Sequence, residues 1–470
     1  MVETWQPDLK EFDGPKYLGL VRALREAIRA GDLAGGARLP PVRDLAWRLS
    51  VTPGTVARAY QIATQDGLLE ATVGRGTYVA TKPTRLRLEA LHWSVEDAAF
   101  PQKPNSGIVD LRSPQLPEVG QGAAVSAVLE QLVGKIGQEF LDYPGLRRDE
   151  PLRRAMAEWL ALRDLGPYGA DDIALTLGGQ NGIGIALQCC MRGDRPYVFC
   201  EELSYPGFRR AVRLNRGEVV PIALDKEGMV PDALDAACRR HGGRIVCLTP
   251  EAQNPTTARM SLERRRAIAE VAVTHDLQII EDECYSVPQS ALPSLRALVP
   301  DRVWHITSLS KSISAGLRFG AIVAPAGLGE AARLAAQHSY FGLPRLVTDV
   351  VLSLMQAGAA QELRAKVQTV FERRLELTLN ILGRHDLRWQ QGLSFVWLPM
   401  PQGWRASTFT REAEGKGVLV RCADEYATAD GRAPNAVRIA LSGGLTEPEF
   451  TAALGILARL LDAPPDDFPV

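Results

Sequence analysis

The sequence predicts an α/β protein in two parts, a small N-terminal domain of short helices with one hairpin and a large domain with a mostly parallel sheet. A length of 470 residues is too great for one ordinary domain. Residues 16–80 show helical apolar spacing followed by strand-like alternation, whereas the chain from about residue 108 alternates helical stretches with short apolar strands. Residues 83–107 show neither pattern, and we interpret them as a linker.

The composition narrows the class of protein. The formal net charge is −1, so any contact with nucleic acid must come from a local basic surface. The 7 cysteines are scattered without CxxC spacing, which argues against a disulfide framework or a zinc site, and we expect no metal. The N-terminus lacks the pattern of a signal peptide, and no apolar run reaches the ~18 residues of a membrane helix. We therefore expect a cytoplasmic protein that does not enter a membrane.

The N-terminal segment is expected to form three helices. The first covers residues 16–30, where Gly31 is a plausible stop. Its apolar stripe, at spacings of three and four, consists of Leu18, Val21, Leu24 and Ile28. Two shorter helices follow, one after Pro40-Pro41 and one after the turn at residues 50–53. Two short helices joined by such a turn form a helix-turn-helix.

The second helix of this pair would present its N-terminal side chains to the major groove of DNA. Those side chains are Thr52, Thr55 and Arg58. The next segment, LLEATVGRGTYVA, alternates apolar and polar residues around a glycine-containing tip, which predicts a two-stranded hairpin. Arg75 at the tip of this hairpin could reach a phosphate or the minor groove.

Residues 14–82 resemble the DNA-binding domain of the GntR family. The resemblance rests on the LPxxRxLA core, the VTxxTVxRAY helix and the GxGTxV hairpin. It implies a winged helix-turn-helix in which five side chains contact DNA, namely Arg43, Thr52, Thr55, Arg58 and Arg75. The alternatives are a three-helix scaffold and a winged helix that binds another protein.

The large domain, residues 108–465, contains four strongly apolar strands, RPYVFCEE, RIVCLTP, LQIIEDE and RVWHITSLS, each between helical stretches. This alternation predicts a mostly parallel sheet covered on both faces. Ligands bind such sheets at the C-terminal ends of the strands. The polar residues near such ends are Gly179, Gln180 and Asn181 before a helix, Asn254, Asp282, Tyr285, Ser308, Lys311 and Arg318.

These residue types suit a cofactor that has a pyridine ring and a phosphate group. A buried lysine amine beside a cationic ring nitrogen can have a lowered pKa and form a Schiff base. A carboxylate paired with the ring nitrogen keeps that nitrogen protonated, so the ring acts as an electron sink. A phenol and an amide can bond the ring hydroxyl, while arginine, serine and the N–H groups of a helix N-terminus suit a dianionic phosphate.

From about residue 110 to 460, the chain resembles the fold-type-I pyridoxal-phosphate (PLP) enzymes, the aspartate-aminotransferase superfamily. The motifs LGGQN, SYPG, AQNPTT, EDECY, SLSKSISAGLRFG and VRIALS occur in the order of that family. The resemblance implies a fold-type-I PLP-dependent transferase domain with a smaller C-terminal subdomain. Lys311 would form the Schiff base, Asp282 would pair with the pyridine nitrogen, Asn254 and Tyr285 would bond the ring oxygen, and Tyr205 would stack on the ring.

The same resemblance implies the remaining contacts. The phosphate would be held by Gly179, Gln180, Asn181, Ser308 and Arg318. Tyr143, in LDYPG, would reach the phosphate of the neighbouring subunit, so a homodimer is expected. Arg438 would bind the carboxylate of a substrate or effector.

The chain departs from the family pattern at three positions. Arg148 and Thr257 stand where glycine is usual, and Ala252 stands where histidine is frequent. None of these changes removes a cofactor contact, so they bear on substrate handling and turnover. Cys284, between two site residues, is expected to point to the other face of its strand as a small core residue.

A GntR-type domain joined to an aminotransferase-like domain is the architecture of the MocR subfamily, which includes the GABA-responsive regulators. The resemblance implies a regulator that binds operator DNA as a head-to-tail homodimer. It would sense a small amine or amino-acid-like effector through transaldimination at Lys311. One alternative is a working aminotransferase with an appended DNA-binding domain. The other is a PLP-free scaffold that binds DNA constitutively.

Overall fold

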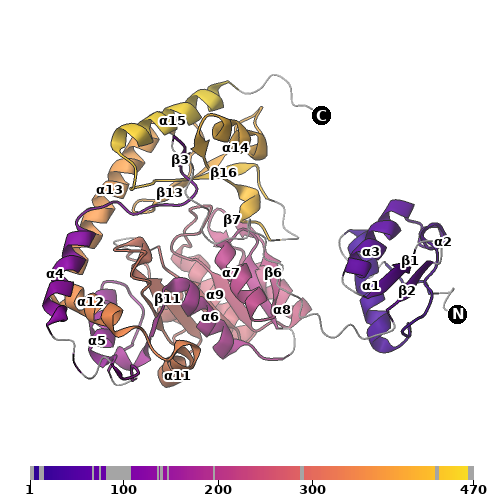
Figure 1. Ribbon diagram of the computed structural model, residues 1–470, viewed down its shortest axis with the longest axis horizontal. Coiled ribbons are helices and arrows are strands. Elements are labelled where there is room, and N and C mark those ends of the chain that lie inside the picture. Colours follow the sequence, from indigo (N-terminus) through magenta and orange to yellow (C-terminus); the bar gives the residue numbers. More distant parts are fainter. Residues whose placement is uncertain are drawn as a thin grey trace. The chain divides into compact units, whose positions relative to one another are not determined.

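The computed structural model describes residues 5–9, 15–65, 68–72, 76–80, 107–134, 137, 141–145, 148–193, 196–285, 290–428 and 433–463. The chain divides into two units, Met1–Pro101 and Gln102–Val470 (Figure 1). Within the described ranges, no helix combines the length and the apolar character that crossing a bilayer requires.

The N-terminal unit contains three helices and one hairpin. Its elements are α1 (Lys16–Ala30), α2 (Val42–Arg48), α3 (Pro53–Gln65), β1 (Leu69–Thr72) and β2 (Gly76–Val79). The two strands pair antiparallel, with Leu69 opposite Val79, so the predicted hairpin is present. Its tip, residues 73–75, lies outside the described residues, and so does the predicted DNA contact Arg75.

The core of this unit forms because each helix turns its small and apolar positions inward. Val56, Ala59 and Ala63 of α3 have no exposed surface and pack against Leu24 of α1 and Leu45 of α2. The predicted stripe of α1 is wrong at one position. Leu18 is 37% exposed, whereas Leu20 is fully buried. With a period of 3.6 residues per turn, the centre of the buried face passes between Leu20, Val21 and Leu24 rather than through Leu18.

The large unit is built on a seven-stranded sheet. In spatial order, its strands are β4 (Ile173–Thr176), β12 (Gly320–Val323), β11 (Val303–Ser308), β10 (Gln278–Asp282), β9 (Ile245–Leu248), β5 (Tyr197–Glu201) and β6 (Glu218–Ile222). Only β12 runs antiparallel to its two neighbours within this sheet. The four strands predicted from apolar runs are β5, β9, β10 and β11, and they are adjacent in the sheet.

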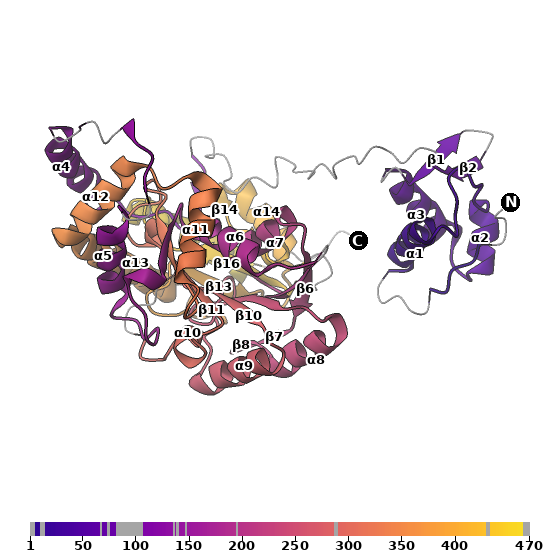
Figure 2. The same ribbon diagram turned by 90° about the horizontal axis from the view of Figure 1, so that it is seen from below.

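Helices cover both faces of the sheet (Figure 2). One face packs on α6 (Gly179–Cys190), α7 (Pro206–Leu214) and α11 (Gly329–Tyr340). The other packs on α8 (Pro231–His241), α9 (Leu262–Thr274) and α10 (Leu295–Leu298). Neighbouring residues of a strand point to opposite faces, so Ile280 contacts the α6 side and Ile279 the α9 side.

A smaller subdomain follows in the chain. Its sheet has the order β13 (Phe395–Pro399), β16 (Ala436–Ala440) and β15 (Arg421–Cys422). It packs with α13 (Ala359–Leu382), α14 (Ala406–Gly415) and α15 (Glu447–Asp462) around one apolar core. Near the start of the unit, β3 (Val109–Asp110) pairs with β14 (Val418–Leu419), which brings residue 112 beside this subdomain.

The large unit has further short elements. They are α4 (Gln121–Val133), α5 (Glu150–Leu160), α12 (Arg345–Gln356), the hairpin of β7 (Leu224–Asp225) with β8 (Gly228–Met229), and three single turns of 3-10 helix at Ala170–Asp172, Leu309–Lys311 and Ala423–Glu425. α12 packs against both α4 and α5.

Candidate functional site

The predicted site residues meet at the C-terminal ends of three neighbouring strands. Asn254 follows β9, Asp282 ends β10, and Lys311 lies in the 3-10 turn directly after β11. These strands are parallel and adjacent, so their ends lie at one edge of the sheet. The amine nitrogen of Lys311 is 5.6 Å from the ring centre of Tyr285, which confirms that these two motifs converge.

Asp282 sits in a buried, hydrogen-bonded environment. Burial raises the pKa of its carboxyl group, and a hydrogen bond from the backbone N–H of Cys284 to Oδ1 at 2.8 Å opposes that shift. The predicted orientation of Cys284 is wrong. Its Sγ lies next to Gly179 of α6, on the same side of the sheet as Asp282. Ile280 and Cys284 both lie in the apolar cluster on the α6 face, although the chain bends at residues 284 and 285 after the end of β10.

The glycines at the start of α6 let two side chains approach the backbone closely. Gly178 adopts φ +84°, and a Cβ there would lie 2.8 Å from Nη2 of Arg318. A Cβ on Gly179 would overlap the Sγ of Cys284. Backbone N–H groups at a helix N-terminus attract anions, so this turn is a suitable phosphate cradle.

The side chains of this turn are partly engaged within the protein. The Oδ1 of Asn181 accepts from the backbone N–H of Leu177 at 3.0 Å, which shapes the turn. Nε2 of Gln180 donates to the carbonyl of Gly207 at 3.0 Å, while its buried Oε1 has no partner among the described residues. Asn181 therefore stabilises the backbone of the turn, whereas the Oε1 of Gln180 can still accept a hydrogen bond.

Arg318 lies over the start of α6, and its partner is a residue that the sequence prediction missed. Its Nη1 donates to Oγ of Ser310 at 3.4 Å, and its Nη2 donates to the carbonyl of Leu177 at 3.2 Å. The predicted ligand Ser308 is 7% exposed, and its hydroxyl is engaged by Phe319 and by the backbone N–H of Ser310. Both serines belong to the SLSK motif, and only the structure shows that Ser310, rather than Ser308, contacts Arg318.

Both predicted site tyrosines meet a phenylalanine ring. Tyr205 directly precedes α7 and meets Phe208 edge-on, with 6.1 Å between ring centres. Burial raises the pKa of Tyr205 well above its usual range, so this phenol stays neutral. Tyr285 meets Phe395 of β13 at 5.2 Å, also edge-on, which connects the site to the smaller subdomain.

Arg438 of β16 is 4% exposed and points back to the same edge. Its Nη1 donates to Oδ1 of Asn254 at 2.8 Å, and its Nη2 donates to the carbonyl of Arg112 at 2.7 Å. The ring-oxygen ligand predicted from NPTT and the carboxylate ligand predicted from VRIALS are thus in direct contact, although 184 residues separate them.

Tyr143 is not part of this cluster. Its side chain is 83% exposed, and its ring lies 6.0 Å from that of Phe341, which is 67% exposed. Two large aromatic side chains therefore lie together on the surface of the large unit.

The described DNA-contact candidates lie on the outer side of α2 and α3. Arg43, Thr52 and Arg58 are exposed, and Thr55 is half-buried. Oγ1 of Thr52 accepts the backbone N–H of Thr55 at 3.3 Å, so Thr52 is the predicted helix cap. The guanidinium carbon of Arg58 lies 4.3 Å from the ring centre of Tyr17 in α1, which restricts the orientation of Arg58.

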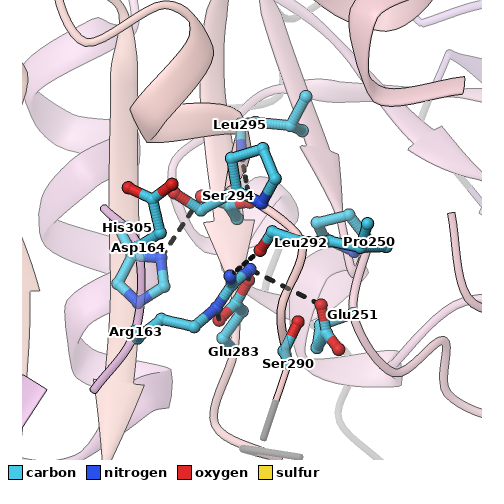
Figure 3. Close-up of polar contacts among 12 residues, drawn as sticks. Arg163, Asp164, Pro250, Glu251, Glu283, Ser290, Leu292, Ser294, Leu295 and His305 are labelled. Carbon is cyan, nitrogen blue, oxygen red and sulfur yellow. Dashed lines mark hydrogen bonds and ion pairs between the residues drawn. The ribbon is translucent and has the colours of Figure 1, made fainter. Parts of the chain in front are cut away.

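A buried ionic network that the sequence did not predict lies behind the site (Figure 3). Nε and Nη2 of Arg163 bind the two carboxylate oxygens of Glu283 at 2.8 and 2.7 Å. Nη2 of Arg163 also lies 3.5 Å from Oε2 of Glu251, and Arg265 binds the same oxygen at 2.5 Å. Arg259 binds Oε1 of Glu251 at 2.8 Å. Since Glu251 precedes Asn254 and Glu283 precedes Tyr285, the network ties both loops of the site together.

Three side chains of this region have the composition of a metal site. The ligand atoms of Glu281, Glu283 and His305 lie within 4.8 Å of one another. However, both oxygens of Glu283 bind Arg163, and those of Glu281 accept from His305 and from the backbone N–H groups of Leu295 and Arg296. The protein itself therefore supplies hydrogen-bond donors to these oxygens, and the positive charge of Arg163, in contact with Glu283, opposes the binding of a cation. We therefore interpret the cluster as part of the ionic network.

Comparison with known families agrees with the geometry. Residues 107–457 match the family model "Aminotransferase class I and II", and residues 16–79 match "Bacterial regulatory proteins, gntR family". A crystal structure of an archaeal alanine:glyoxylate aminotransferase superposes with a TM-score of 0.67 at 22% identity, covering 76% of this chain and 91% of that chain. The predicted fold class is confirmed.

Two relatives share the whole arrangement. The chain is 28% identical over 468 residues to the "Uncharacterized HTH-type transcriptional regulator YdeF" of Bacillus subtilis (strain 168), covering 98% of this chain and 97% of the relative. It is 24% identical over 436 residues to the "Probable rhizopine catabolism regulatory protein MocR" of Rhizobium meliloti, covering 87% and 86%. The similarity thus includes both units in their order along the chain.

Proposed function

The chain belongs to the aminotransferase class I and II family and carries a gntR-family domain at its N-terminus, and we propose that it is a transcription regulator controlled by a small molecule. The N-terminal domain binds operator DNA, and the aminotransferase-like domain senses a small amine or amino-acid-like effector. Enzymes of the class I and II family use PLP, and we propose PLP as the cofactor of this chain.

The observation that supports the proposal best is the meeting of Lys311, Asp282 and Asn254 at one sheet edge, in a chain that also has a winged helix-turn-helix. The direct test is the visible absorption spectrum of the purified protein, followed by borohydride reduction and mass spectrometry. A reduced cofactor adduct on Lys311 is the expected result. A colourless protein that takes up no PLP would contradict the proposal and favour a cofactor-free scaffold.

The residues present fit the cofactor. The guanidinium of Arg318 lies against the glycine turn before α6, 2.8 Å from the position of an added Cβ at Gly178, so a cation and the N–H groups of a helix N-terminus stand together as a bound phosphate would require. The buried Oε1 of Gln180 lacks a partner among the described residues, and as an acceptor it suits a water molecule or a donor group rather than the phosphate itself. Bound PLP supplies an aldehyde carbon that condenses reversibly with primary amines.

Each side chain then has a defined task. Lys311 supplies the resident amine, and Asp282 holds the proton on the pyridine nitrogen as a paired carboxylate. Because Oδ1 of Asn254 already accepts from Arg438, its amide N–H groups are left to donate to the ring oxygen. Tyr285 donates to the same oxygen, and Tyr205 packs against the ring plane.

Arg438 binds the carboxylate of the effector. It is buried, and within the described residues it contacts an amide oxygen and a backbone carbonyl but no carboxylate. A buried cation without an anionic partner is costly, so an anionic ligand is stabilised there. Arg438 would thereby hold one end of the effector, while the effector amine would compete with the amine of Lys311 for the aldehyde that PLP would supply.

The effector regulates DNA binding only if it binds two arrangements of the protein with different affinity. Arg438 and Phe395 belong to the smaller subdomain, whereas Lys311 and Asp282 belong to the main sheet. An effector that contacts both therefore favours one arrangement of the two parts.

Replacing Arg58 with alanine is expected to weaken DNA binding by about ten- to hundred-fold, because a charge-assisted hydrogen bond is lost. The effect should show in fluorescence anisotropy with DNA from upstream of the gene of this protein. Arg22→Ala, which removes an exposed arginine of α1, serves as the matched control and should change the affinity little. Equal effects of both substitutions would mean that Arg58 contributes only to the general charge.

Tyr143 reaches the phosphate site of a second subunit, so the functional unit is a homodimer, which we expect to be head-to-tail. Its 83% exposure beside Phe341 suits a residue that a partner covers. We expect sedimentation equilibrium to give a dimer without DNA, and an operator with two half-sites. A monomer with full cofactor occupancy would contradict the role of Tyr143.

The second candidate function is transamination by the same site. The presence of Lys311, Asp282, Asn254 and Tyr285 together favours it, because these groups also serve turnover. Continued release of a keto acid from an amino acid, at a rate above that of free PLP, would distinguish an enzyme from a sensor.

A further inference from the structure

The guanidinium of Arg438 is held between two aromatic rings. Its central carbon lies 5.0 Å from the ring centre of Phe395 and 5.1 Å from that of Tyr426. The rings keep the charge out of water and restrict its plane, while Asn254 and Arg112 each accept one hydrogen bond. The Nε–H of Arg438 is buried and has no partner among the described residues.

Tyr426 is the second buried group at this place that lacks a partner. Its side chain is 2% exposed, and its hydroxyl forms no hydrogen bond within the described part of the chain. Its backbone carbonyl accepts from the N–H of Ser204 at 3.1 Å, directly before Tyr205. An unpartnered buried hydroxyl costs about 1–3 kcal/mol, so such a group indicates a ligand or an ordered water.

The electrostatics make this hydroxyl a donor. Burial raises the pKa of Tyr426 to about 12, although the nearby charges of Arg438 and Arg421 act in the opposite direction. The phenol is therefore neutral over the physiological pH range and can donate a hydrogen bond to an acceptor.

A continuous aromatic wall leads from the lysine to this pair. The Lys311 amine is 5.6 Å from the ring of Tyr285, which is 5.2 Å from the ring of Phe395, and Arg438 follows at 5.0 Å. A ligand whose amine reaches Lys311 and whose carboxylate reaches Arg438 would lie beside these rings. Its carboxylate arrives where Arg438 and Tyr426 both have donors without partners.

We propose that Tyr426 is a specificity-determining residue whose hydroxyl donates a hydrogen bond to the effector carboxylate beside Arg438. This inference rests on the proposed function, because it presupposes an amine-bearing effector in the same pocket. This hydrogen bond selects amino acids over the corresponding amines, since an amine without a carboxylate would leave the hydroxyl of Tyr426 and the Nε–H of Arg438 without an acceptor.

The test compares Tyr426→Phe with the unaltered holo-protein. The substitution removes one oxygen and keeps the ring that faces Arg438, and the removed oxygen has no described partner, so the fold should be retained. The probes are the twenty protein amino acids and β-alanine, each beside the amine that lacks its carboxyl group. Binding is followed by the visible absorbance of the protein.

For amino acids that bind, Tyr426→Phe is expected to lower the affinity about ten-fold, and Arg438→Ala by one to two decades. The affinity for the matching amines should not change in Tyr426→Phe. Tyr168→Phe is the matched control, because the hydroxyl of Tyr168 donates to the carbonyl of Ala157, away from this pocket. It should leave both affinities unchanged.

The two hypotheses fail in different ways. If Tyr426→Phe binds amino acids as tightly as the unaltered protein while Arg438→Ala binds them weakly, the hydroxyl only holds water and this inference is wrong. An equal loss of affinity for amino acids and amines would also contradict it, because the effect would then be structural. If the unaltered protein responds to none of the probes, the proposed amino-acid sensing itself is contradicted.

Discussion

Replacing Lys311 with alanine is expected to abolish the visible absorbance of the lysine-bound cofactor and every spectral response to effectors. Of the described site residues, only Lys311 places an amine beside Tyr285, at 5.6 Å from its ring, and no other lysine lies in the motifs around the site. The glycine turn of α6 and Arg318 remain, so weak non-covalent binding of PLP should persist. The measurement is an absorption titration with PLP.

DNA binding serves as the internal control for this substitution. The N-terminal domain has its own core, in which Leu20, Leu24 and Leu45 have no exposed surface. The affinity of Lys311→Ala for DNA should therefore match that of the unaltered protein without effector. A borohydride-reducible adduct that survives in the pocket of Lys311→Ala would show that the lysine is misassigned.

Replacing Arg163 with methionine is expected to destabilise the large domain by about 3–5 kcal/mol, because it leaves Glu283 buried without its partner. The two side chains are 13% and 4% exposed and share two hydrogen bonds below 3 Å. Urea unfolding followed by tryptophan fluorescence measures the loss. The cofactor affinity should fall as well, since Arg163 ties the loop of Tyr285 to that of Asn254.

The pH dependence of this loss has a definite sign. Burial raises the pKa of Glu283, but the hydrogen bonds and charge of Arg163 outweigh it and hold the pKa well below its usual range. The pair therefore stabilises the protein above the unfolded pKa of about 4.3, and this contribution is lost as the pH falls through the folded pKa. In Arg163→Met the largest opposing influence on burial is lost, and the pKa of Glu283 rises, although the charges of His305 and Arg265 still act to lower it. The deficit should then be complete at neutral pH and shrink as acid protonates Glu283.

Arg154→Met provides the matched control for this experiment. Arg154 pairs with Glu150 one helical turn away on α5, and the two side chains are 70% and 45% exposed. An exposed pair of this kind contributes about 0.3–0.5 kcal/mol, so its loss should be small at any pH. If Arg163→Met cost no more than Arg154→Met, the buried network would not stabilise the site.

The sequence predicted the parts of the site that follow strands. Lys311, Asp282 and Asn254 each stand at the end of an apolar run, and parallel strands bring such ends together without further information. The helix cap Thr52 and the hairpin of β1 and β2 could also be predicted, because a cap and an alternating strand pattern depend on residues that are close in the sequence.

The ionic network could not be predicted in this way. Arg163 meets Glu251 across 88 residues and Glu283 across 120 residues, and its own segment has no motif. The orientation of Cys284 failed for a related reason. The prediction placed Cys284 on the other face of its strand, whereas its Sγ lies beside Gly179 on the α6 side. Pairings and orientations of this kind depend on the packed structure.

The measurement that tests the central claim most directly combines both domains. The holo-protein is titrated with each amino acid while its visible absorbance and its anisotropy with fluorescent upstream DNA are recorded together. Sensing predicts that one effector changes both signals with the same midpoint, and that Lys311→Ala loses both changes while it still binds the DNA. An effector that changes the absorbance fully and leaves the DNA affinity unaltered would contradict the claim that this site regulates DNA binding.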